Sequence, residues 1–405
     1  MNRGVVILGS TGSIGTQALD VIRRHRDSFH VMGLGAGGTR IDLLAQQTAE
    51  FNPPAVAIAD ISHVGELREA LAAHGVHQCE ILAGADALEK LAGQWGSSTG
   101  GDVVVLNGIN GSVGLRPTLA ALKSGATLAL ANKESLVVGG GLVARAMVRP
   151  GQIVPVDSEH SAIAQALRSG VHHRGLTSLN LDGESEVRRI ILTASGGPFR
   201  GKKRADLRNV TAQQALHHPT WNMGPVVTIN SSTLMNKGLE IIEAAYLFDM
   251  APADLVPVVH PQSIVHSMVE FRDGATIAQA SPPDMRLPIA LGLSWPERLD
   301  DVARPNSWDQ ASMWTFEPVD TETFPAITLA QHAVAASPFH PAVFNAANEE
   351  CVAAFLHGQI GYLDIVDTVE RVLGEFTAPS GSVDVETVLG VETWARDCAH
   401  RIAAH

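Results

Sequence analysis

The sequence is poor in cysteine and has no long apolar run. Three of its 405 residues are cysteines, Cys79, Cys351 and Cys398, widely spaced and without a Cys-x-x-Cys pair. This excludes a disulfide scaffold and a cysteine-rich zinc site, and it is typical of a reducing compartment. No window approaches the roughly 18 uninterrupted apolar residues of a membrane helix, and the N-terminus lacks a signal-peptide core. We therefore expect a cytoplasmic protein that binds no membrane.

Basic residues are also scarce, since 29 Lys and Arg face 42 Asp and Glu, for a formal net charge of −13. This balance argues against a nucleic-acid binder, which needs a basic surface, but it allows a local site for an anionic small molecule. With 45% hydrophobic and 18% charged residues the chain is not disordered. Its length suggests two or three domains.

Residues 1–150 alternate short apolar runs with helical patterns. Such alternation predicts an α/β fold, a Rossmann-like parallel sheet with helices on both faces. The expected strands are residues 5–8, 30–34, 56–59, 103–106 and 127–130, and the expected helices are residues 16–24, 41–50, 65–73 and 115–123.

The pattern changes after Pro150. Residues 151–295 predict an α+β domain, with strands at 153–156, 190–192, 226–229, 256–259 and 276–278 and a helix at 233–248. Residues 296–323 are irregular and rich in Pro, Trp and Asp, which indicates a linker. Residues 324–405 are mostly helical and predict a small C-terminal helical domain.

A glycine-rich turn follows the first strand and opens the first helix. It reads GSTGSIG at 9–15, with glycines at GxxGxxG spacing. Glycines permit a tight turn and let backbone N–H groups approach a pyrophosphate at the helix N-terminus. The position predicts a dinucleotide site. The alternative is an ordinary tight turn of an α/β domain.

The end of the second strand bears on which dinucleotide binds. An NAD site places Asp or Glu there for the ribose hydroxyls. This chain has no carboxylate between Gly35 and Arg40, and Thr39 or Arg40 could meet a 2′-phosphate instead. The pattern favours NADP over NAD, unless Arg40 lies in a solvated loop.

Two carboxylates close the strand at 153–156. If the strand continues, Asp157 and Glu159 share one face at i and i+2. Close carboxylates repel unless a cation intervenes, and Glu240, with Asn236 one helical turn before it, could complete a site. Oxygen ligands select Mg²⁺ or Mn²⁺. The alternative is a solvated strand end.

Several short segments offer hydroxyl, amide and cationic groups for a phosphorylated ligand. Ser195 precedes two glycines, and Ser231 begins a Ser-Ser-Thr run that we expect to cap the helix carrying Lys237. A helix start with a lysine suits a phosphate, although simple capping explains the serines as well. The loop at 217–224 is bounded by Pro and Gly and carries Trp and Met, as in loops that close over ligands. Residues 132–134 end a strand at the carboxyl edge of the sheet, where ligands bind.

Taken together, these motifs resemble the 1-deoxy-D-xylulose 5-phosphate reductoisomerase family over essentially the whole chain. The resemblance rests on the order and spacing of GSTGSIG at 9–15, ANKESLV at 131–137, PVDSEH at 155–160, SGGPF at 195–199, HPTWNMG at 218–224, MNKGLE at 235–240, HPQSIVHSM at 260–268, PDMR at 283–286 and NAANE at 345–349. It implies a homodimer with an NADPH domain, a catalytic domain and a C-terminal helical domain. It also implies the metal-dependent conversion of 1-deoxy-D-xylulose 5-phosphate, a phosphorylated sugar, to 2-C-methyl-D-erythritol 4-phosphate, by retro-aldol cleavage, rejoining of the fragments and reduction by NADPH.

The resemblance assigns roles to residues by matching motifs. The metal ligands are Asp157, Glu159 and Glu240, which together with Lys133 form the catalytic set. The substrate-binding set is Lys133, Ser158, Glu159, Ser195, His218, Trp221, Ser231, Asn236, Lys237 and Glu240. The cofactor-binding set is Thr11, Gly12, Ser13, Ile14, Gly37, Gly38, Asn132, Glu134, Gly224 and Met285. Met223 joins Trp221 in a flap, and Ser263 and His266 support the pocket.

Some questions stay open at this level. Gly37 and Gly38 stand where other members carry Lys and Asn, so the 2′-phosphate contact falls to Thr39, Arg40 or backbone N–H groups. The general base is unassigned between Lys133 and metal-activated oxygen. Two rival functions are an NADP-dependent semialdehyde or homoserine-type dehydrogenase, which needs no metal triad, and a nucleotide-sensing regulatory module, which leaves the three carboxylates without a role.

Overall fold

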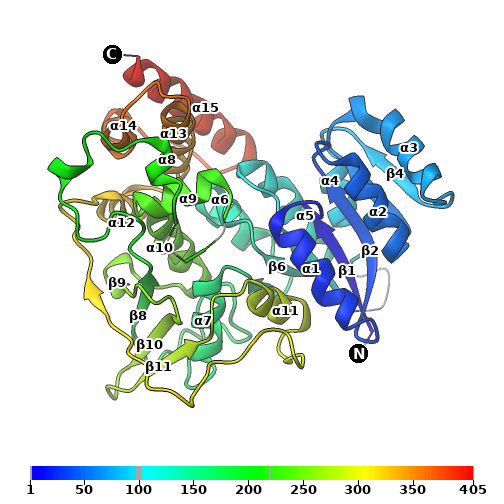
Figure 1. The fold of residues 1–405 in the computed structure, drawn as a ribbon, viewed down its shortest axis with the longest axis horizontal. Helices are drawn as coiled ribbons and strands as arrows, with labels where there is room; N and C mark the ends of the chain where they lie inside the picture. The colour runs from blue at the N-terminus through cyan, green and yellow to red at the C-terminus, as the bar shows by residue number, and fades with distance from the viewer. Residues whose placement is uncertain (1, 97–101, 219, 222, 405) are drawn as a thin grey trace.

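The computed structural model describes residues 2–96, 102–218, 220–221 and 223–404. Figure 1 shows an N-terminal body at the right, a second body built on a smaller sheet at the lower left, and helices of the C-terminal segment packed above the latter. Residues 130–170 run between the two bodies. The predicted α/β fold class, with a mixed central part and a helical C-terminal part, is confirmed.

The N-terminal body is a parallel sheet of seven strands in the order β4-β3-β2-β1-β5-β6-β7. The strands are β1 (Arg3–Leu8), β2 (Phe29–Ala36), β3 (Ala55–Ile58), β4 (Glu80–Ala83), β5 (Val103–Asn107), β6 (Thr127–Leu130) and β7 (Ile153–Pro155). The helices are α1 (Ser13–Arg24), α2 (Ile41–Phe51), α3 (Val64–Ala73), α4 (Ala87–Gly93), α5 (Leu115–Ser124) and α6 (Lys133–Ala146). The sequence analysis did not anticipate β4 and α4. Strand order reverses between β1 and β5, which is where doubly wound sheets bind ligands.

The apolar run of β1 explains why this sheet is covered on both faces. Val5 and Ile7 belong to one hydrophobic cluster, and Val6 and Leu8 belong to another on the opposite face. Side chains of a strand alternate between faces, so a continuous apolar run fits only a strand buried on both sides. This strand therefore carries the glycine-rich turn on a rigid base.

Two segments beyond residue 150 complete the N-terminal body. Strand β7 pairs with β6 as the edge of the first sheet. Helix α11 (Arg286–Ser294) packs Ile289 and Leu293 into the same cluster as Val5, and Arg3 Nη1 donates to the Leu293 carbonyl at 2.9 Å. The domain limits 1–150, 151–295, 296–323 and 324–405 stay a prediction. The structure adds that β7 and α11, which both lie beyond residue 150 in the chain, pack with the N-terminal body.

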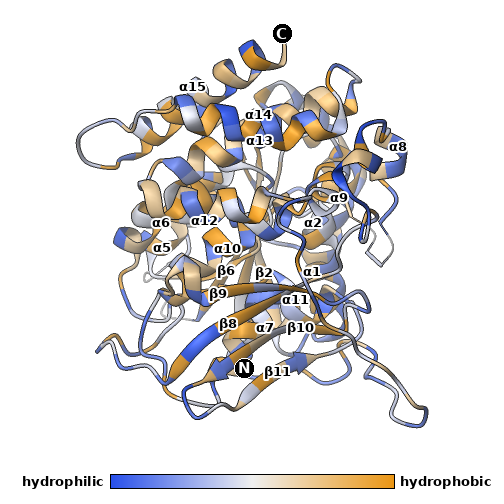
Figure 2. Ribbon diagram, turned by 90° about the vertical axis from the view of Figure 1, so that its left-hand side faces the viewer, coloured by the Kyte–Doolittle hydropathy of each residue, from blue (hydrophilic) through white to orange (hydrophobic). Residues whose placement is uncertain are grey.

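The second sheet has five strands in the order β11-β10-β8-β9-β12. They are β8 (Val187–Ala194), β9 (Leu255–Val259), β10 (Val265–Phe271), β11 (Thr276–Ala280) and β12 (Glu317–Pro318). Strands β8 and β9 are parallel and the other pairs are antiparallel. Helices α7 (Ser158–Leu167) and α10 (Met235–Phe248) contact this sheet. Figure 2 shows β9 and α10 largely in the hydrophobic colour, in the interior.

One expectation for this region is wrong, and one predicted helix is present with a later start. Residues 226–229, predicted as a strand, lie in helix α9 (Pro225–Ser232). Pro225 presets the helical φ at the first position, and Val226 and Val227 face solvent rather than a sheet. The predicted helix at 233–248 starts at Met235, because Leu234 adopts a left-handed φ of 59° and separates α9 from α10.

The C-terminal part is helical, as expected. It consists of α12 (Ala326–Ala336), α13 (His340–Leu356), α14 (Tyr362–Glu375) and α15 (Val385–Ala403). Helix α13 packs against the other three and against α6 of the N-terminal body. Short helices lie elsewhere, namely α8 (Ala212–Ala215), η1 (Ile61–His63), η3 (Ser112–Gly114), η4 (Arg204–Leu207) and η5 (Pro252–Asp254).

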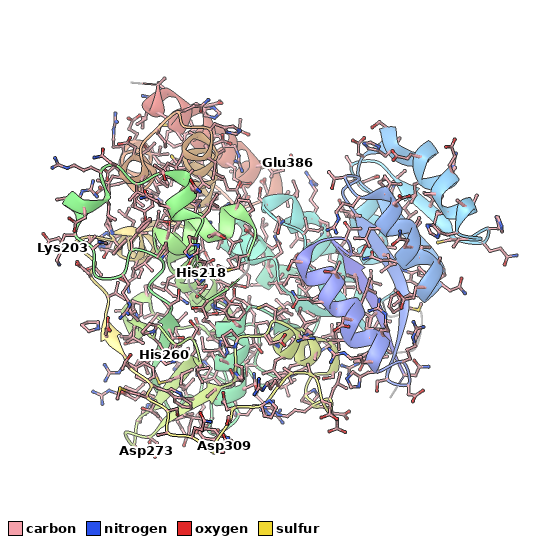
Figure 3. The ribbon with its side chains drawn as sticks, viewed as in Figure 1. Lys203, His218, His260, Asp273, Asp309 and Glu386 are labelled. Atoms are coloured by element: carbon pink, nitrogen blue, oxygen red, sulfur yellow. The ribbon has the colours of Figure 1, made fainter. Side chains whose placement is uncertain are left out.

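The segment at 296–323 is irregular except for β12, and ion pairs attach it to the body. Lys203, labelled at the left edge of Figure 3, lies 2.8 Å from Asp320, and Arg200 lies 2.7 Å from Glu317. Arg200 and Lys203 thus each have an acidic partner in this segment. Among the described helices, none combines the length and apolarity needed to cross a bilayer.

Candidate functional site

The first part of the site is the start of α7. Asp157 is the N-cap of this helix, and its Oδ1 accepts a hydrogen bond from the backbone N–H of Glu159 at 3.2 Å. The expectation of a continuing strand with both carboxylates on one face is therefore wrong. An Asp at the N-cap position satisfies a helix-terminal N–H that a strand would not offer. The two carboxylates nevertheless stay close.

Helix α10 supplies the second part. Asn236 and Glu240 lie one turn apart, as expected, and Asn236 Nδ2 donates to Glu240 Oε1. One oxygen from each of Asp157, Glu159 and Glu240 lies within 4.8 Å of the others. The structure thus brings together the three carboxylates that the sequence proposed, across two helices that are far apart in the chain.

Two buried lysines neutralise these acids. Lys133 Nζ lies 2.8 Å from Asp157 and 3.5 Å from Glu240, and it donates to Asn236 Oδ1 at 3.0 Å. Lys237 Nζ contacts Glu159 at 2.9 Å and also contacts Glu240. Lys237 is only 3% exposed, so its ammonium group is held inside the cluster and not in solvent.

Burial and neighbouring charge set the protonation of the cluster. Burial alone would raise the pKa of Asp157, but Lys133 holds that pKa well below its usual range. Burial together with Glu159 raises the pKa of Glu240 to about 7. Burial would lower the pKa of Lys133, yet Asp157 and Glu240 raise it well above its usual value. Lys133 is therefore held as an ammonium ion, which makes it a hydrogen-bond donor and a poor base in this arrangement.

The donor set fits a hard divalent cation. Three carboxylates offer oxygen ligands only, with no thiolate or imidazole among them, and Mg²⁺ and Mn²⁺ prefer such ligands. The cationic groups that meet these oxygens now, Lys133 and Lys237, show that the cluster requires positive charge. Asp157, Glu159 and Glu240 are the residues that could hold the metal.

A second charged pair, His160 and Glu243, lies next to the triad and was not predicted from the sequence. His160 Nδ1 lies 3.0 Å from Glu243, and its Nε2 donates to the Glu240 carbonyl oxygen at 2.9 Å. Burial would lower the pKa of His160, but Glu243 raises it to about 9. The pair fixes α7 against α10. Glu243 follows Glu240 at i+3 on the same helix face, a spacing that could have revealed it.

The opposite wall of the pocket is polar and uncharged. His218 Nε2 lies 3.1 Å from both Ser195 Oγ and Ser231 Oγ, so that the imidazole joins two segments of the chain. Burial lowers the pKa of His218, which favours the neutral ring. Ser231 lies near the end of α9, not at a helix start, so the predicted cap with a phosphate at its N-terminus is wrong. The pocket lining includes the residues just named and also Ser158, Trp221, Met223, Ser263 and His266.

The loop before α9 borders this pocket. His218, near the middle of the left-hand body in Figure 3, accepts a hydrogen bond at Nδ1 from the Trp221 N–H at 2.8 Å. The Trp221 ring lies 6.2 Å from that of His266. Pro219 and Asn222 of this predicted flap lie outside the described residues. Trp221 also lines a second groove with Met285, the N-cap of α11, and Gln17 of α1, whereas Gly224 is the exposed N-cap of α9.

The glycine-rich turn has the geometry of a phosphate site. Gly9 has a φ of 81°, and a Cβ at Gly15 would lie 2.3 Å from the Gly9 carbonyl oxygen. Only glycine fits where the backbones approach this closely. Gly12 is the N-cap of α1 and no side chain caps the helix, nor is any acid in its first turn. The first N–H groups of α1 are thus available to an anion, and Thr11, Ser13 and Ile14 surround them.

A second segment on the same sheet edge follows β6. The Asn132 side chain caps α6 by accepting from the Ser135 N–H at 3.0 Å, and its Nδ2 donates to Glu134 Oε2 at 2.9 Å. Burial raises the pKa of Glu134 to about 7. Because β6 and β1 flank β5, Asn132 and Glu134 lie at the same carboxyl edge as the glycine turn.

The adenosine end of a dinucleotide would meet the segment after β2. Arg40 Nη1 donates to the Thr11 carbonyl oxygen at 2.5 Å, so it reaches the glycine turn rather than a distant solvated loop. Gly37 has open space where a Cβ would stand, and Gly38 has a φ of 128°. Arg40 is thereby placed beside the turn as a cation for an anionic cofactor.

Comparison with known proteins points in one direction. Models of 1-deoxy-D-xylulose 5-phosphate reductoisomerase match residues 5–140, and models of its C-terminal domains match 153–248 and 280–398. The reductoisomerase of Beutenbergia cavernae is 59% identical over 99% of this chain and 98% of its own, and that of Bifidobacterium longum is 58% identical over 98% and 96%. The Zymomonas mobilis enzyme in complex with NADPH has a TM-score of 0.87 and 41% identity, covering 100% and 99% of the two chains. A reductoisomerase in complex with NADPH, fosmidomycin and magnesium has a TM-score of 0.88 and 34% identity over 99% and 98%.

Proposed function

The chain belongs to the 1-deoxy-D-xylulose 5-phosphate reductoisomerase family, and we propose that the pocket between α7, α10 and the loop before α9 is its active site. The protein is an enzyme that converts 1-deoxy-D-xylulose 5-phosphate to 2-C-methyl-D-erythritol 4-phosphate and depends on NADPH and a divalent metal. This is an NADP-dependent oxidoreductase step in isoprenoid precursor biosynthesis. The assignment of individual residues to this reaction is the proposal.

The observation that carries the proposal is the convergence of Asp157, Glu159 and Glu240 within 4.8 Å. A bound Mg²⁺ or Mn²⁺ would act as a Lewis acid on the substrate carbonyl and an adjacent hydroxyl. Lys133 and Lys237, which now pair with these acids, would be released to donate hydrogen bonds to substrate oxygens. Lys133 serves as a donor near the substrate hydroxyls, together with Ser158.

The polar wall suits the substrate phosphate. Ser195, His218 and Ser231 form one hydrogen-bonded group, and Asn236 and Lys237 approach it from α10. Hydrogen bonds to a phosphate far from the reacting carbons provide binding energy for positioning. Trp221 and Met223 line the same pocket and would exclude water from an aldehyde intermediate.

The edge of the first sheet suits NADPH. Its phosphates would meet the α1 N-terminus at Thr11, Gly12, Ser13 and Ile14, with Gly37, Gly38 and Arg40 at the adenosine end. Asn132 and Glu134, then Gly224 and Met285, continue toward the substrate pocket. NADPH supplies the hydride for the reduction, and Arg40 is the residue that we propose for its 2′-phosphate.

The structure bears on the rival functions as well. A semialdehyde dehydrogenase needs a catalytic cysteine, and the pocket lining contains none of the three cysteines. A nucleotide-sensing module would leave the carboxylate cluster and its two lysines unused. The lack of a cysteine in the pocket lining therefore disfavours a semialdehyde dehydrogenase, and the charged cluster disfavours a homoserine-type dehydrogenase and a sensing module.

The test is NADPH oxidation with 1-deoxy-D-xylulose 5-phosphate, with and without Mg²⁺ or Mn²⁺, followed by identification of the product. We expect oxidation only with substrate and metal together, giving 2-C-methyl-D-erythritol 4-phosphate. Oxidation of a semialdehyde instead, or turnover unaffected by metal removal, would contradict the assignment.

We further propose that the enzyme works as a homodimer in the cytoplasm. Large apolar side chains of the segment at 296–323 face solvent, with Trp308 at 74% and Met313 at 78% exposure, and exposed apolar groups of this size are typical of interfaces. The free cysteines suit a reducing compartment. Sedimentation analysis of the wild type and of Trp308→Glu tests the dimer, since that substitution should favour the monomer.

A further inference from the structure

Arg396 of α15 connects two neighbouring acids of α13. Its Nη2 lies 2.5 Å from Glu349 Oε2, and its Nη1 lies 2.8 Å from Glu350 Oε1. The guanidinium is 29% exposed, so the pair is partly shielded from solvent. No role in the proposed reaction has been given to any of these three residues.

The two acids differ in how much they depend on Arg396. Glu350 has a second partner, because its Oε2 lies 2.6 Å from His400 Nε2. The other partner of Glu349 is a neutral amide, Asn345 Nδ2, at 3.0 Å. Over the described part of the chain, Arg396 is the sole cationic side chain in ion-pair range of Glu349. Loss of Arg396 would therefore leave the charge of Glu349 uncompensated.

Glu349 also reaches the N-terminal body. Its Oε1 lies 3.8 Å from the point where a Cβ at Gly111 would stand, and Gly111 has a φ of 79°. The Gly111 carbonyl oxygen accepts a hydrogen bond from Asn132 Nδ2 at 2.9 Å. The same Nδ2 donates to Glu134. The carboxylate of Glu349 thus lies beside the turn whose carbonyl oxygen holds the Asn132 side chain, next to the residues proposed to lie along NADPH.

Other residues of α15 also lie close to the N-terminal body, on the side where NADPH is proposed to bind. Glu392 of α15 is 3% exposed, and burial raises the pKa of its carboxyl to about 7, with Glu349 and Glu134 raising it further. At the start of α15, Glu386 lies 2.6 Å from Arg116 of α5, and Figure 3 labels it where the C-terminal helices meet the N-terminal body. Glu349 adds to the effect of burial in raising the pKa of Glu134. The acids of the two bodies therefore interact electrostatically.

We propose that Arg396 is a positioning residue for the NADPH site. By neutralising Glu349 it holds the turn at Gly111, and through that turn the Asn132 side chain, in the conformation that receives the cofactor. The C-terminal helical domain thus contributes to cofactor affinity without touching the cofactor. This inference rests on the proposed function, in which Asn132 and Glu134 lie along NADPH.

The competing interpretation is that Arg396 only joins α13 to α15. Both interpretations expect some loss of stability without the guanidinium. They differ in the effect of a second substitution, Glu349→Gln, which keeps the shape and removes the charge. If the role is to neutralise Glu349, the second substitution restores NADPH affinity, whereas a purely structural role leaves the double variant as weak as the single one.

The experiment measures the dissociation constant of NADPH by fluorescence titration of full-length enzyme without substrate, for Arg396→Met, Arg396→Lys and the double variant Arg396→Met/Glu349→Gln. The control is Arg401→Met, which removes another α15 arginine, paired with Glu375. We expect Arg396→Met to weaken NADPH roughly tenfold, the scale of a charged hydrogen bond. The other three variants should stay within about threefold of the wild type on the same scale.

Each result has a defined meaning. Wild-type affinity in Arg396→Met, or equal weakening in the double variant, overturns the inference. Failure of the wild type to bind NADPH overturns the proposed cofactor site instead. If Arg396→Met does not fold, Arg396→Gln and Arg396→Gln/Glu349→Gln provide the decision, because the inference expects weakened NADPH binding in the former and near-wild-type binding in the latter.

Discussion

Lys237 Nζ lies 2.9 Å from Oε1 of Glu159, although 78 positions separate these residues in the chain. This contact joins α10 to α7 and places a buried ammonium ion among three carboxylates. Together with Lys133, this lysine offsets part of the negative charge that a divalent ion would otherwise neutralise. The charges of the site can then be tested one at a time.

Replacement of Glu240 by Gln should abolish most of the turnover. The substitution removes one of three negative oxygen ligands and keeps the side chain's size, so we expect kcat to fall at least about 100-fold. NADPH is proposed to bind at the glycine-rich turn after β1, away from Glu240, so its dissociation constant should not change. Steady-state kinetics at limiting Mn²⁺ and a cofactor titration measure the two effects.

The matched control for that substitution is Glu386→Gln, at an exposed position of α15. It should keep wild-type kinetics. Wild-type turnover in Glu240→Gln at limiting metal would remove Glu240 from the metal site.

Replacement of Ser231 by Ala should affect substrate binding selectively. Its hydroxyl faces His218 and Ser195 in the pocket, and loss of one hydrogen bond to a charged phosphate should raise KM for the sugar phosphate roughly tenfold. The metal dependence should be unchanged. Ser232→Ala is the neighbouring control, because Ser232 Oγ donates to the Ile229 carbonyl oxygen instead. An equal rise in KM in both variants would argue against a phosphate site at Ser231.

Replacement of Gly15 by Ala should disrupt the cofactor turn. The new Cβ would lie 2.3 Å from the Gly9 carbonyl oxygen and 2.4 Å from Ser10 Cα, both backbone atoms that cannot move independently. We expect a loss of about 3 kcal/mol in unfolding free energy, at the upper end of overpacking costs, together with loss of NADPH binding. Urea denaturation and titration report these effects.

The control for the glycine turn is Gly65→Ala. Gly65 lies in α3 and has open space around a Cβ, so this variant should be unchanged or stabilised by about 0.5 kcal/mol. Equal behaviour of the two glycine variants would show that close backbone approach is not what Gly15 provides.

Glu134 makes the stability of the apoenzyme depend on pH. The native carboxyl has a pKa of about 7, against 4.5 as the reference for an exposed Glu. Between these values the unfolded chain binds fewer protons than the native one, so the unfolding free energy falls as pH rises. Glu134→Gln removes this penalty and should be the more stable form at pH 8, by up to about 2 kcal/mol.

Denaturation of the apoenzyme in urea between pH 5 and 8 tests this. The difference between wild type and Glu134→Gln should vanish toward pH 5, where the native carboxyl is protonated. If the difference in unfolding free energy between the two proteins did not change with pH, its cause would be packing and not the ionisation of Glu134.

Much of the fold could be predicted from the sequence. The strands of the first sheet other than the partly exposed β4, and the glycine turn, were identified because a buried parallel strand is a continuous apolar run and a close backbone approach demands glycine. The members of the carboxylate triad were also identified, although their local structure was not, since an i, i+2 pair fits a strand and an N-cap equally well.

The failures share a cause. Val226 and Val227 predicted a strand because β-branched residues favour strands, but Pro225 and the packing of α9 determined a helix. The i+3 spacing from Glu240 points to Glu243, but the pairing of Glu243 with His160 joins two helices and has no local signal. Local patterns cannot report contacts between distant segments.

By itself, the sequence determined which chemical groups are present and in what order. It placed a glycine turn, an acidic pair, a Ser-His-Ser set and a helix with Lys237 and Glu240 along one chain, because such motifs depend on local backbone geometry. The tertiary structure alone decided that Lys133 and Lys237 pair with the triad, and that Arg396 of the last helix pairs with Glu349 of α13. Those relationships arise from helices packing around shared cores, and the charges that meet there are set by burial and distance.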